Sequence, residues 1–144
     1  MKKFLFLAIA LLLAYSFLQL QDATPPAVDQ TPSIYNSALQ TAYRNRQSDI
    51  QVEGRGTVIK ILSDDLKGSR HQRFILELPS GQTVLVAHNI DLAPKVSDLR
   101  KGDTVVFYGE YEWNAKGGVI HWTHRDPERR HVSGWLKHHG KIYQ

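Results

Sequence analysis

The chain has 144 residues, enough for one domain of ordinary size, and 42% of them are hydrophobic, so a small buried core can form. It contains no cysteine, which excludes disulfide bonds, thiolate metal sites and a lipid-modified cysteine. The formal charge of +4 and the sequence pI near 9.4 favour an anionic ligand, single-stranded nucleic acid or an anionic lipid surface as partner.

The first 20 residues have the pattern of an export signal. Two lysines precede an apolar run at 4–18, which is short for a membrane span of about 20 residues. We therefore expect a periplasmic or secreted bacterial protein. The alternative is an uncleaved inner-membrane anchor, through which alone the chain would contact the membrane. Residues 21–32 contain three prolines and are predicted to form an extended linker.

The folded domain is predicted to span residues 33–144 and to begin with a helix at 33–47. Ser33 is a suitable N-cap, and apolar residues recur at i, i+4 spacing behind it. The apolar side is predicted to contain Ile34, Ala38 and Ala42, with Tyr35, Leu39 and Tyr43 beside them. We expect this helix to cover one end of the structure that follows.

Residues 50–124 have the two-residue period of β-strands. Gly54 and Gly56 predict a bend in the first strand, and the connection at 89–100 is irregular. The five predicted strands cover 50–62, 72–78, 82–88, 104–113 and 118–124. Their number and connections predict an all-β fold, a small five-stranded OB-fold-like barrel. An SH3-like barrel and a two-sheet sandwich are the alternatives.

Residues 125–144 form a tail rich in histidine and tryptophan, which is predicted to end in a hairpin. His139-Gly140 has the composition of a two-residue turn, and it separates two short apolar segments. Trp135 is the predicted hydrophobic anchor of this C-terminal hairpin. His139 is expected at the exposed tip of the turn.

Alternation in the fifth strand predicts which side chains face the core. If Ile120 and Trp122 point inward, His121 and Thr123 point outward, and His124 falls on the Trp122 side. His121 and His124 can then share a metal ion only if the strand bends between them.

The tail nevertheless holds a candidate site for a divalent metal such as zinc. Histidine and carboxylate groups are suitable zinc ligands, and three or four of them must converge on one ion. The preferred set is His124, Asp126 and His131, with His121 or His138 as a further contributor. The alternative is that these are polar rim residues without a metal.

The chain also supplies candidate ligand-binding residues, because OB barrels bind nucleic-acid strands and sugars through aromatic and basic groups. These candidates are Arg70, Arg73, Trp122, Arg125, Arg129, Arg130 and Trp135. We therefore expect an exported OB-fold-like binding or accessory module of unknown ligand. A metal-dependent hydrolase of the nuclease or phosphodiesterase type is the alternative, and no catalytic residue is assigned.

Several motifs resemble those of an uncharacterised bacterial domain-of-unknown-function family of small exported proteins. The resemblance covers residues 51–144 and is most specific in the His-Trp-Thr-His, Gly-Trp and Tyr-Gln elements of the tail. The motifs are Leu-Pro-Ser-Gly-Gln at 78–82, Ala-His-Asn-Ile-Asp-Leu-Ala-Pro at 87–94, Lys-Gly-Asp at 101–103, Gly-Glu-Tyr-Glu-Trp at 109–113, Gly-Gly-Val-Ile-His-Trp-Thr-His at 117–124, Asp-Pro at 126–127, Gly-Trp at 134–135 and Tyr-Gln at 143–144. The resemblance implies that the tail is a functional unit, but it assigns no activity.

A weaker resemblance is to staphylococcal-nuclease-like OB barrels. Gly-Thr-Val at 56–58, Asp-Asp at 64–65 and the segment 84–94 with Ile90-Asp91 are similar to that group's opening strand and aspartate-containing strand end. The resemblance implies a calcium-dependent nuclease. The chain departs from it, because the following Gly- and Arg-rich segment with a catalytic glutamate and a second arginine is absent.

Overall fold

The computed structural model describes residues 31–144 and forms a β-barrel. Strand β1 (Ile50–Ile61) closes this barrel because its two halves pair with different neighbours. Residues 50–57 pair with β4 (Thr104–Glu112), and residues 57–61 pair with β2 (His71–Glu77). The predicted bend in this strand therefore lies where the pairing changes.

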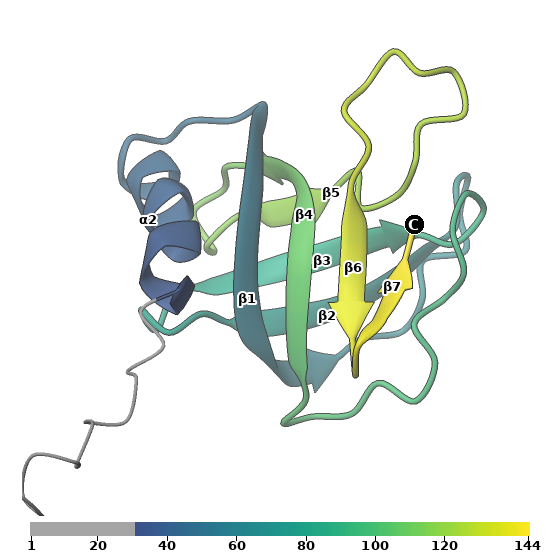
Figure 1. Cartoon of the computed structure of the whole chain (residues 1–144), viewed down its shortest axis with the longest axis horizontal. Coiled ribbons are helices and arrows are strands. Elements are labelled where there is room, and N and C mark those ends of the chain that lie inside the picture. Colours follow the sequence, from purple (N-terminus) through teal and green to yellow (C-terminus); the bar gives the residue numbers. More distant parts are fainter. Residues whose placement is uncertain (1–30) are drawn as a thin grey trace, which may run out of the picture.

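The barrel closes in the order β1-β2-β3-β5-β4-β1, with all neighbours antiparallel except β3 and β5 (Figure 1). The other strands are β3 (Thr83–Asn89), β5 (Val119–His121), β6 (Trp135–His138) and β7 (Lys141–Tyr143). The last two extend the sheet beyond β4. The predicted all-β, five-stranded OB-like barrel with an N-terminal helix and a C-terminal hairpin is confirmed, and its closure excludes an open two-sheet sandwich.

The core follows the predicted alternation, because successive residues of a strand point to opposite faces. Phe74 and Leu76 of β2 and Phe107 and Tyr111 of β4 are fully buried. Leu136 of β6 joins the same cluster, so the C-terminal hairpin is packed against the barrel. Burial of these large side chains is the main source of the barrel's stability.

Helix α2 (Thr31–Arg44) covers one end of the barrel (Figure 1) and begins and ends slightly earlier than predicted. Leu39 and Ala42 are buried against the core, as predicted, and Asn36 is buried with them. Ala38, which was expected on the apolar side, is exposed. The side chains of Ile34 and Tyr35 are not among those that the structure describes, so their place on the apolar side stays a prediction.

The C-terminal hairpin has the predicted turn. His139 and Gly140 both have positive φ, 46° and 79°, as a two-residue hairpin turn of this class requires. His139 is exposed at the tip, and Trp135 lies partly buried at the start of β6.

The fifth strand is shorter than predicted, and its alternation ends early. β5 stops at His121, and Trp122 has a positive φ of 51°. This left-handed residue shifts the pattern by one position, so Thr123 and His124 are both buried while the Trp122 ring is partly exposed. The prediction that Trp122 faces the core and Thr123 faces outward is therefore wrong.

The predicted leader and most of the predicted linker lie outside the described residues. Within 31–144, the helix is too short and too polar to cross a membrane.

Candidate metal centre and adjoining groove

Two glutamates on β4 form one side of the candidate site. Glu110 and Glu112 flank Tyr111, whose side chain is fully buried, so both carboxylates point away from the core. Strand β5 lies beside them, with His121 directly opposite Glu110 and Val119 opposite Glu112. The strand register therefore places an outward-facing histidine between two outward-facing carboxylates.

The donor atoms of these three side chains converge. His121 Nε2 lies 3.1 Å from Glu110 Oε1 and 3.8 Å from Glu112 Oε1. One ligand atom from each residue lies within 4.8 Å of the other two. The arrangement brings two carboxylates and one imidazole together at the scale of a single coordination sphere.

His121 Nε2 is buried and has no hydrogen-bond partner. Glu110 is near enough for an ion pair, but its carboxylate is not aligned to accept a hydrogen bond from this nitrogen. A buried polar atom without a partner is costly. This nitrogen therefore lies where a ligand atom or ion would satisfy it.

His131, in the loop between β5 and β6, holds the other oxygen of Glu110. Its Nε2 lies 2.6 Å from Glu110 Oε2, and its Nδ1 lies 2.8 Å from the Val132 carbonyl oxygen. A protonated ring, which donates through both nitrogens, satisfies both of these hydrogen bonds. Burial lowers the pKa of His131, but the Glu110 and Val132 hydrogen bonds and the nearby carboxylates outweigh this effect and raise it above 6.5.

Trp122 completes this side of the site through its left-handed backbone. Its ring stacks on the His131 ring, with centroids 4.0 Å apart and planes 11° apart. It also lies 5.3 Å from the His124 ring. The unusual conformation of Trp122 therefore positions an aromatic surface that holds the His131 loop against the barrel.

Asp126 folds that loop instead of offering ligand atoms. Its carboxylate accepts backbone hydrogen bonds from Glu128, Arg130 and His131. Burial opposes ionisation of Asp126, but the hydrogen bonds from His131 and Arg130 outweigh it and lower the pKa of Asp126. The loop returns to β6 at Gly134, where an added Cβ would collide with the carbonyl oxygens of Trp122 and Tyr108. Only glycine fits this close crossing of backbones.

The structure does not bring His124, Asp126 and His131 together as a set of three donors. Within residues 31–144, the groups of donor atoms that converge are Glu110–Glu112–His121 and Asp103–His138–His139. His124 is buried and donates from Nδ1 to the Arg125 carbonyl oxygen. Of the five predicted ligands, His121 and His131 do meet, through their shared partner Glu110.

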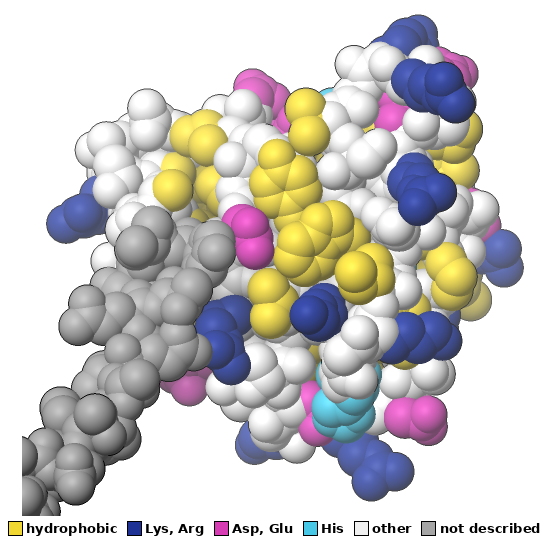
Figure 2. All heavy atoms as spheres, in the orientation of Figure 1, with side chains coloured by type: hydrophobic (Ala, Val, Ile, Leu, Met, Phe, Trp, Pro, Cys, Tyr) yellow, Lys and Arg dark blue, Asp and Glu magenta, His cyan; other side chains and the backbone are white. Residues whose placement is uncertain are grey.

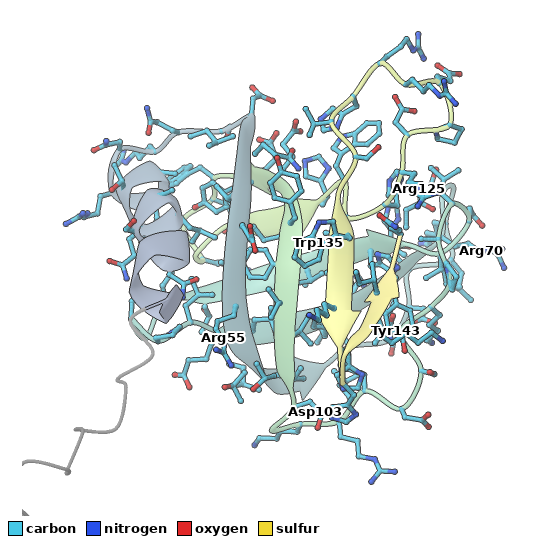
Figure 3. The ribbon with its side chains drawn as sticks, viewed as in Figure 1. Arg55, Arg70, Asp103, Arg125, Trp135 and Tyr143 are labelled. Carbon is cyan, nitrogen blue, oxygen red and sulfur yellow. The ribbon has the colours of Figure 1, made fainter. Side chains whose placement is uncertain are left out.

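Asp103 lies at the opposite end of β4 (Figure 3), and His138 of β6 lies beside it. His138 is buried and its Nε2 lies 2.8 Å from Asp103 Oδ2, while the exposed His139 stacks on it at 3.9 Å. The Arg100 backbone hydrogen bond and then the His138 side-chain hydrogen bond lower the pKa of Asp103. These contacts already satisfy Asp103 Oδ2 and His138 Nε2, so the contact between these two residues is structural.

The predicted arginines are dispersed. Arg70 pairs with Asp91 at 2.6 Å, and Arg73 donates to the Ser63 carbonyl oxygen. Arg130 pairs with Glu128, and Arg125 and Arg129 are exposed in the same loop. Trp135 follows Arg130 by five residues, at the start of β6, and its ring contacts Tyr108. Arg70, Arg73 and Arg130 are therefore held by contacts within the protein.

An open groove runs beside the candidate site across β2, β3 and β5. One pocket of about 380 Å³ is lined by residues that include Asp65, His71, Arg73, Leu85, Glu112 and His121. A second, of about 310 Å³, shares His71 and His121 with it and extends to Trp122 and His124. A small ligand in this groove would contact the site directly.

Sequence reasoning missed Glu110 and Glu112, although a signal was present. Carboxylates at i and i+2 in a predicted strand must share a face, and the apolar residue between them places that face outside. The prediction favoured the tail histidines, which are close together in sequence. The candidate site is instead formed where β4 pairs with β5, which brings together residues from two strands.

Two comparisons bear on the whole chain. The family model described as "Protein of unknown function (DUF3465)" matches residues 25–144. A search of curated proteins gives no match.

Proposed function

The chain belongs to the DUF3465 family, whose function is unknown, and we propose that it is a binding module that holds a divalent transition-metal ion such as zinc. The ligands are Glu110, Glu112 and His121. The observation that carries this proposal is the buried, unpartnered His121 Nε2, which lies close to two carboxylates.

The spacing of the donor atoms supports a zinc-sized ion. Ligand atoms about 2.1 Å from an ion at a tetrahedral angle are separated by about 3.4 Å. The distances of 3.1 and 3.8 Å from His121 Nε2 to the two carboxylates bracket this value. Little movement is therefore needed for the three side chains to bind one ion. Three protein ligands leave one position for water or a ligand, as in catalytic zinc sites.

His131 has a positioning role in this proposal. Its hydrogen bond to Glu110 Oε2 fixes the carboxylate and leaves Glu110 Oε1 directed toward His121. Partners of this kind orient metal ligands, and their loss lowers metal affinity by about 10- to 100-fold. The loop carrying His131 thus supports the site from outside the coordination sphere.

A zinc titration tests the proposal. We expect the purified full chain to bind one zinc ion, and His121→Ala to lower the affinity by more than 100-fold, since a ligand is lost. His131→Gln should cause the smaller loss of about 10- to 100-fold that follows from removing an outer partner. Isothermal titration calorimetry measures both losses of affinity.

His139→Ala is the matched control, because it removes a histidine from the second donor group without touching the first. It should leave zinc affinity unchanged. If instead His139→Ala loses the ion and His121→Ala retains it, the ion belongs beside Asp103 and the proposal is wrong. Failure of the wild-type protein to bind any divalent metal is equally decisive.

The adjoining groove favours a second function, that of a metal-dependent hydrolase of phosphodiesters. The 380 Å³ pocket contacts both Glu112 and His121 and carries the cationic Arg73 on its wall. A bound metal would supply an activated water there, and Arg73 would attract the anionic substrate. We expect slow, zinc-dependent release of nitrophenol from bis(p-nitrophenyl) phosphate. Equal release by His121→Ala would show that the metal site is not responsible.

We further propose that residues 1–20 export the protein to the periplasm or beyond the cell. The support is the sequence pattern of two lysines before an apolar run. N-terminal sequencing of protein recovered from the periplasmic fraction tests this. Recovery of a chain that begins at Met1 in the inner-membrane fraction would support the anchor instead.

A further inference from the structure

Two aromatic rings lie side by side on the outer face of the sheet formed by β1, β4, β6 and β7. Tyr108 of β4 and Trp135 of β6 are directly opposite each other, and their ring centroids are 6.2 Å apart. Both side chains are partly exposed. Figure 2 shows a continuous apolar patch on this face. Figure 3, in the same orientation, shows that Trp135 lies near the centre of that patch.

A row of cationic residues runs beside the two rings. Val106 lies two residues before Tyr108 on β4, with Arg55 of β1 opposite it on one side and Lys137 of β6 on the other. Two residues along a strand correspond to about 7 Å. The aromatic row, Tyr108 and Trp135, thus lies beside a second row, Arg55–Val106–Lys137, which has one cation at each end.

Two carboxylates adjoin the aromatic row, and one of them, Glu53, lies two residues from Arg55 on β1. Glu53 is opposite Tyr108 on β1, and Glu110 follows two residues after Tyr108 on β4, where His131 pairs with it. Negative charge therefore borders the aromatic row at its β1 end and on the side away from Arg55 and Lys137. Along β4, the charge therefore changes from the Glu110 carboxylate, past the aromatic row, to the cations on either side of Val106.

We propose that this face binds single-stranded nucleic acid, with bases stacked on Tyr108 and Trp135 and phosphates beside Arg55 and Lys137. Stacking on aromatic residues combined with a cationic track is how such strands are bound without sequence preference. The carboxylates direct the phosphates to the Arg55–Lys137 side. This proposal is independent of the metal site.

A second copy of the chain is the alternative occupant of this face. A two-fold dimer places the same patch of each subunit against the other. Sedimentation of the chain without oligonucleotide distinguishes a second copy from an anionic strand.

Fluorescence anisotropy with a labelled thymidine oligonucleotide of about 15 nucleotides tests the proposal. The purified full chain is titrated in EDTA, so that metal binding does not contribute. We expect binding that weakens steadily with salt concentration. Trp135→Ala should weaken it by about 5- to 150-fold, the stacking contribution of one aromatic residue, and Trp135→Phe should retain most of the affinity.

Lys137→Glu should weaken binding and lower the magnitude of the salt slope by about 1. Lys116→Glu, in the exposed turn after β4, is the matched control for net charge and should bind like the wild-type protein. Thermal unfolding checks that each variant is folded. If Trp135→Ala does not fold, Trp135→Phe and Lys137→Glu decide the result.

The proposal is overturned if the wild-type protein shows no salt-dependent binding at low ionic strength. It is also overturned if folded Trp135→Ala and Lys137→Glu variants both bind like Lys116→Glu. A dimer that depends on Trp135, measured by sedimentation in the absence of oligonucleotide binding, would assign the face to a second copy. Binding of a neutral polysaccharide without oligonucleotide binding would assign it to sugars.

Discussion

Gly118→Ala is expected to lower the free energy of unfolding by about 2–5 kcal/mol, a large part of the stability of a domain this size. Gly118 has a φ of +99°, and a left-handed backbone costs a residue with a Cβ about 1–2 kcal/mol. The added Cβ would also collide with the ring of Tyr111, which is fully buried. Overpacking of this kind costs about 1–3 kcal/mol more.

The same substitution should weaken the proposed metal site. Gly117, beside Gly118, accepts hydrogen bonds from Tyr111 Oη at 3.2 Å and from Gln82 Nε2 at 3.0 Å. These contacts hold the start of β5 between β3 and β4, and His121 lies at the end of that short strand. Displacing the turn therefore moves His121 relative to the glutamates.

Urea unfolding followed by tryptophan fluorescence measures the loss, with Gly68→Ala as the control. Gly68 also has a positive φ, +64°, but an added Cβ meets nothing within 4 Å. The control should therefore lose only the backbone contribution of about 1–2 kcal/mol. Equal losses in the two variants would contradict the role of the Tyr111 contact.

Acid should destabilise the fold through His88, by about 3 kcal/mol between pH 6.5 and pH 4. His88 is fully buried, and burial lowers its pKa from 6.5 to about 4, with the charges of His124 and His71 acting in the same direction. Between these pH values the unfolded chain binds a proton that the folded chain does not. Stability is therefore complete above about pH 6.5 and falls as the pH drops toward 4.

The contacts of His88 fix its tautomer, whereas burial keeps it neutral. Its Nε2 donates to the Pro94 carbonyl oxygen at 3.1 Å, and its Nδ1 accepts from the Thr123 hydroxyl at 2.8 Å. Protonation of Nδ1 would remove an acceptor and place a charge in the core. Thr123 occupies this position because the left-handed Trp122 turns it inward.

Comparison of wild type with His88→Gln isolates this contribution. Glutamine can still donate to Pro94 but does not titrate, so the variant should be less stable at neutral pH and lose less stability on acidification. His131 has the opposite effect on stability. Because the pKa of His131 is raised in the folded chain, its contribution to the free energy of unfolding is complete below about pH 6.5 and is lost at higher pH. If urea unfolding at pH 7 and pH 4.5 gives the same difference between the two proteins, His88 is not the acid-sensitive group.

Much of the fold could be predicted because the signals are local. Phe74 and Leu76 alternate with polar residues, and the structure buries both. His139-Gly140 predicted a turn that requires two positive φ angles, and both are present. The end of β5 could not be predicted in this way. A tryptophan has no intrinsic preference for a left-handed backbone, and it adopts one here where it packs on His131.

The sequence by itself determined the strands, the turns and the family, because backbone preference and alternation depend on neighbouring residues. It also supplied the residue types of a metal site. Only the tertiary structure decided which of them meet. Glu110 and His121 are joined by the register of β4 with β5, and His131 reaches Glu110 from a loop folded by Asp126. Such contacts depend on packing between distant segments, which no local pattern of residues encodes.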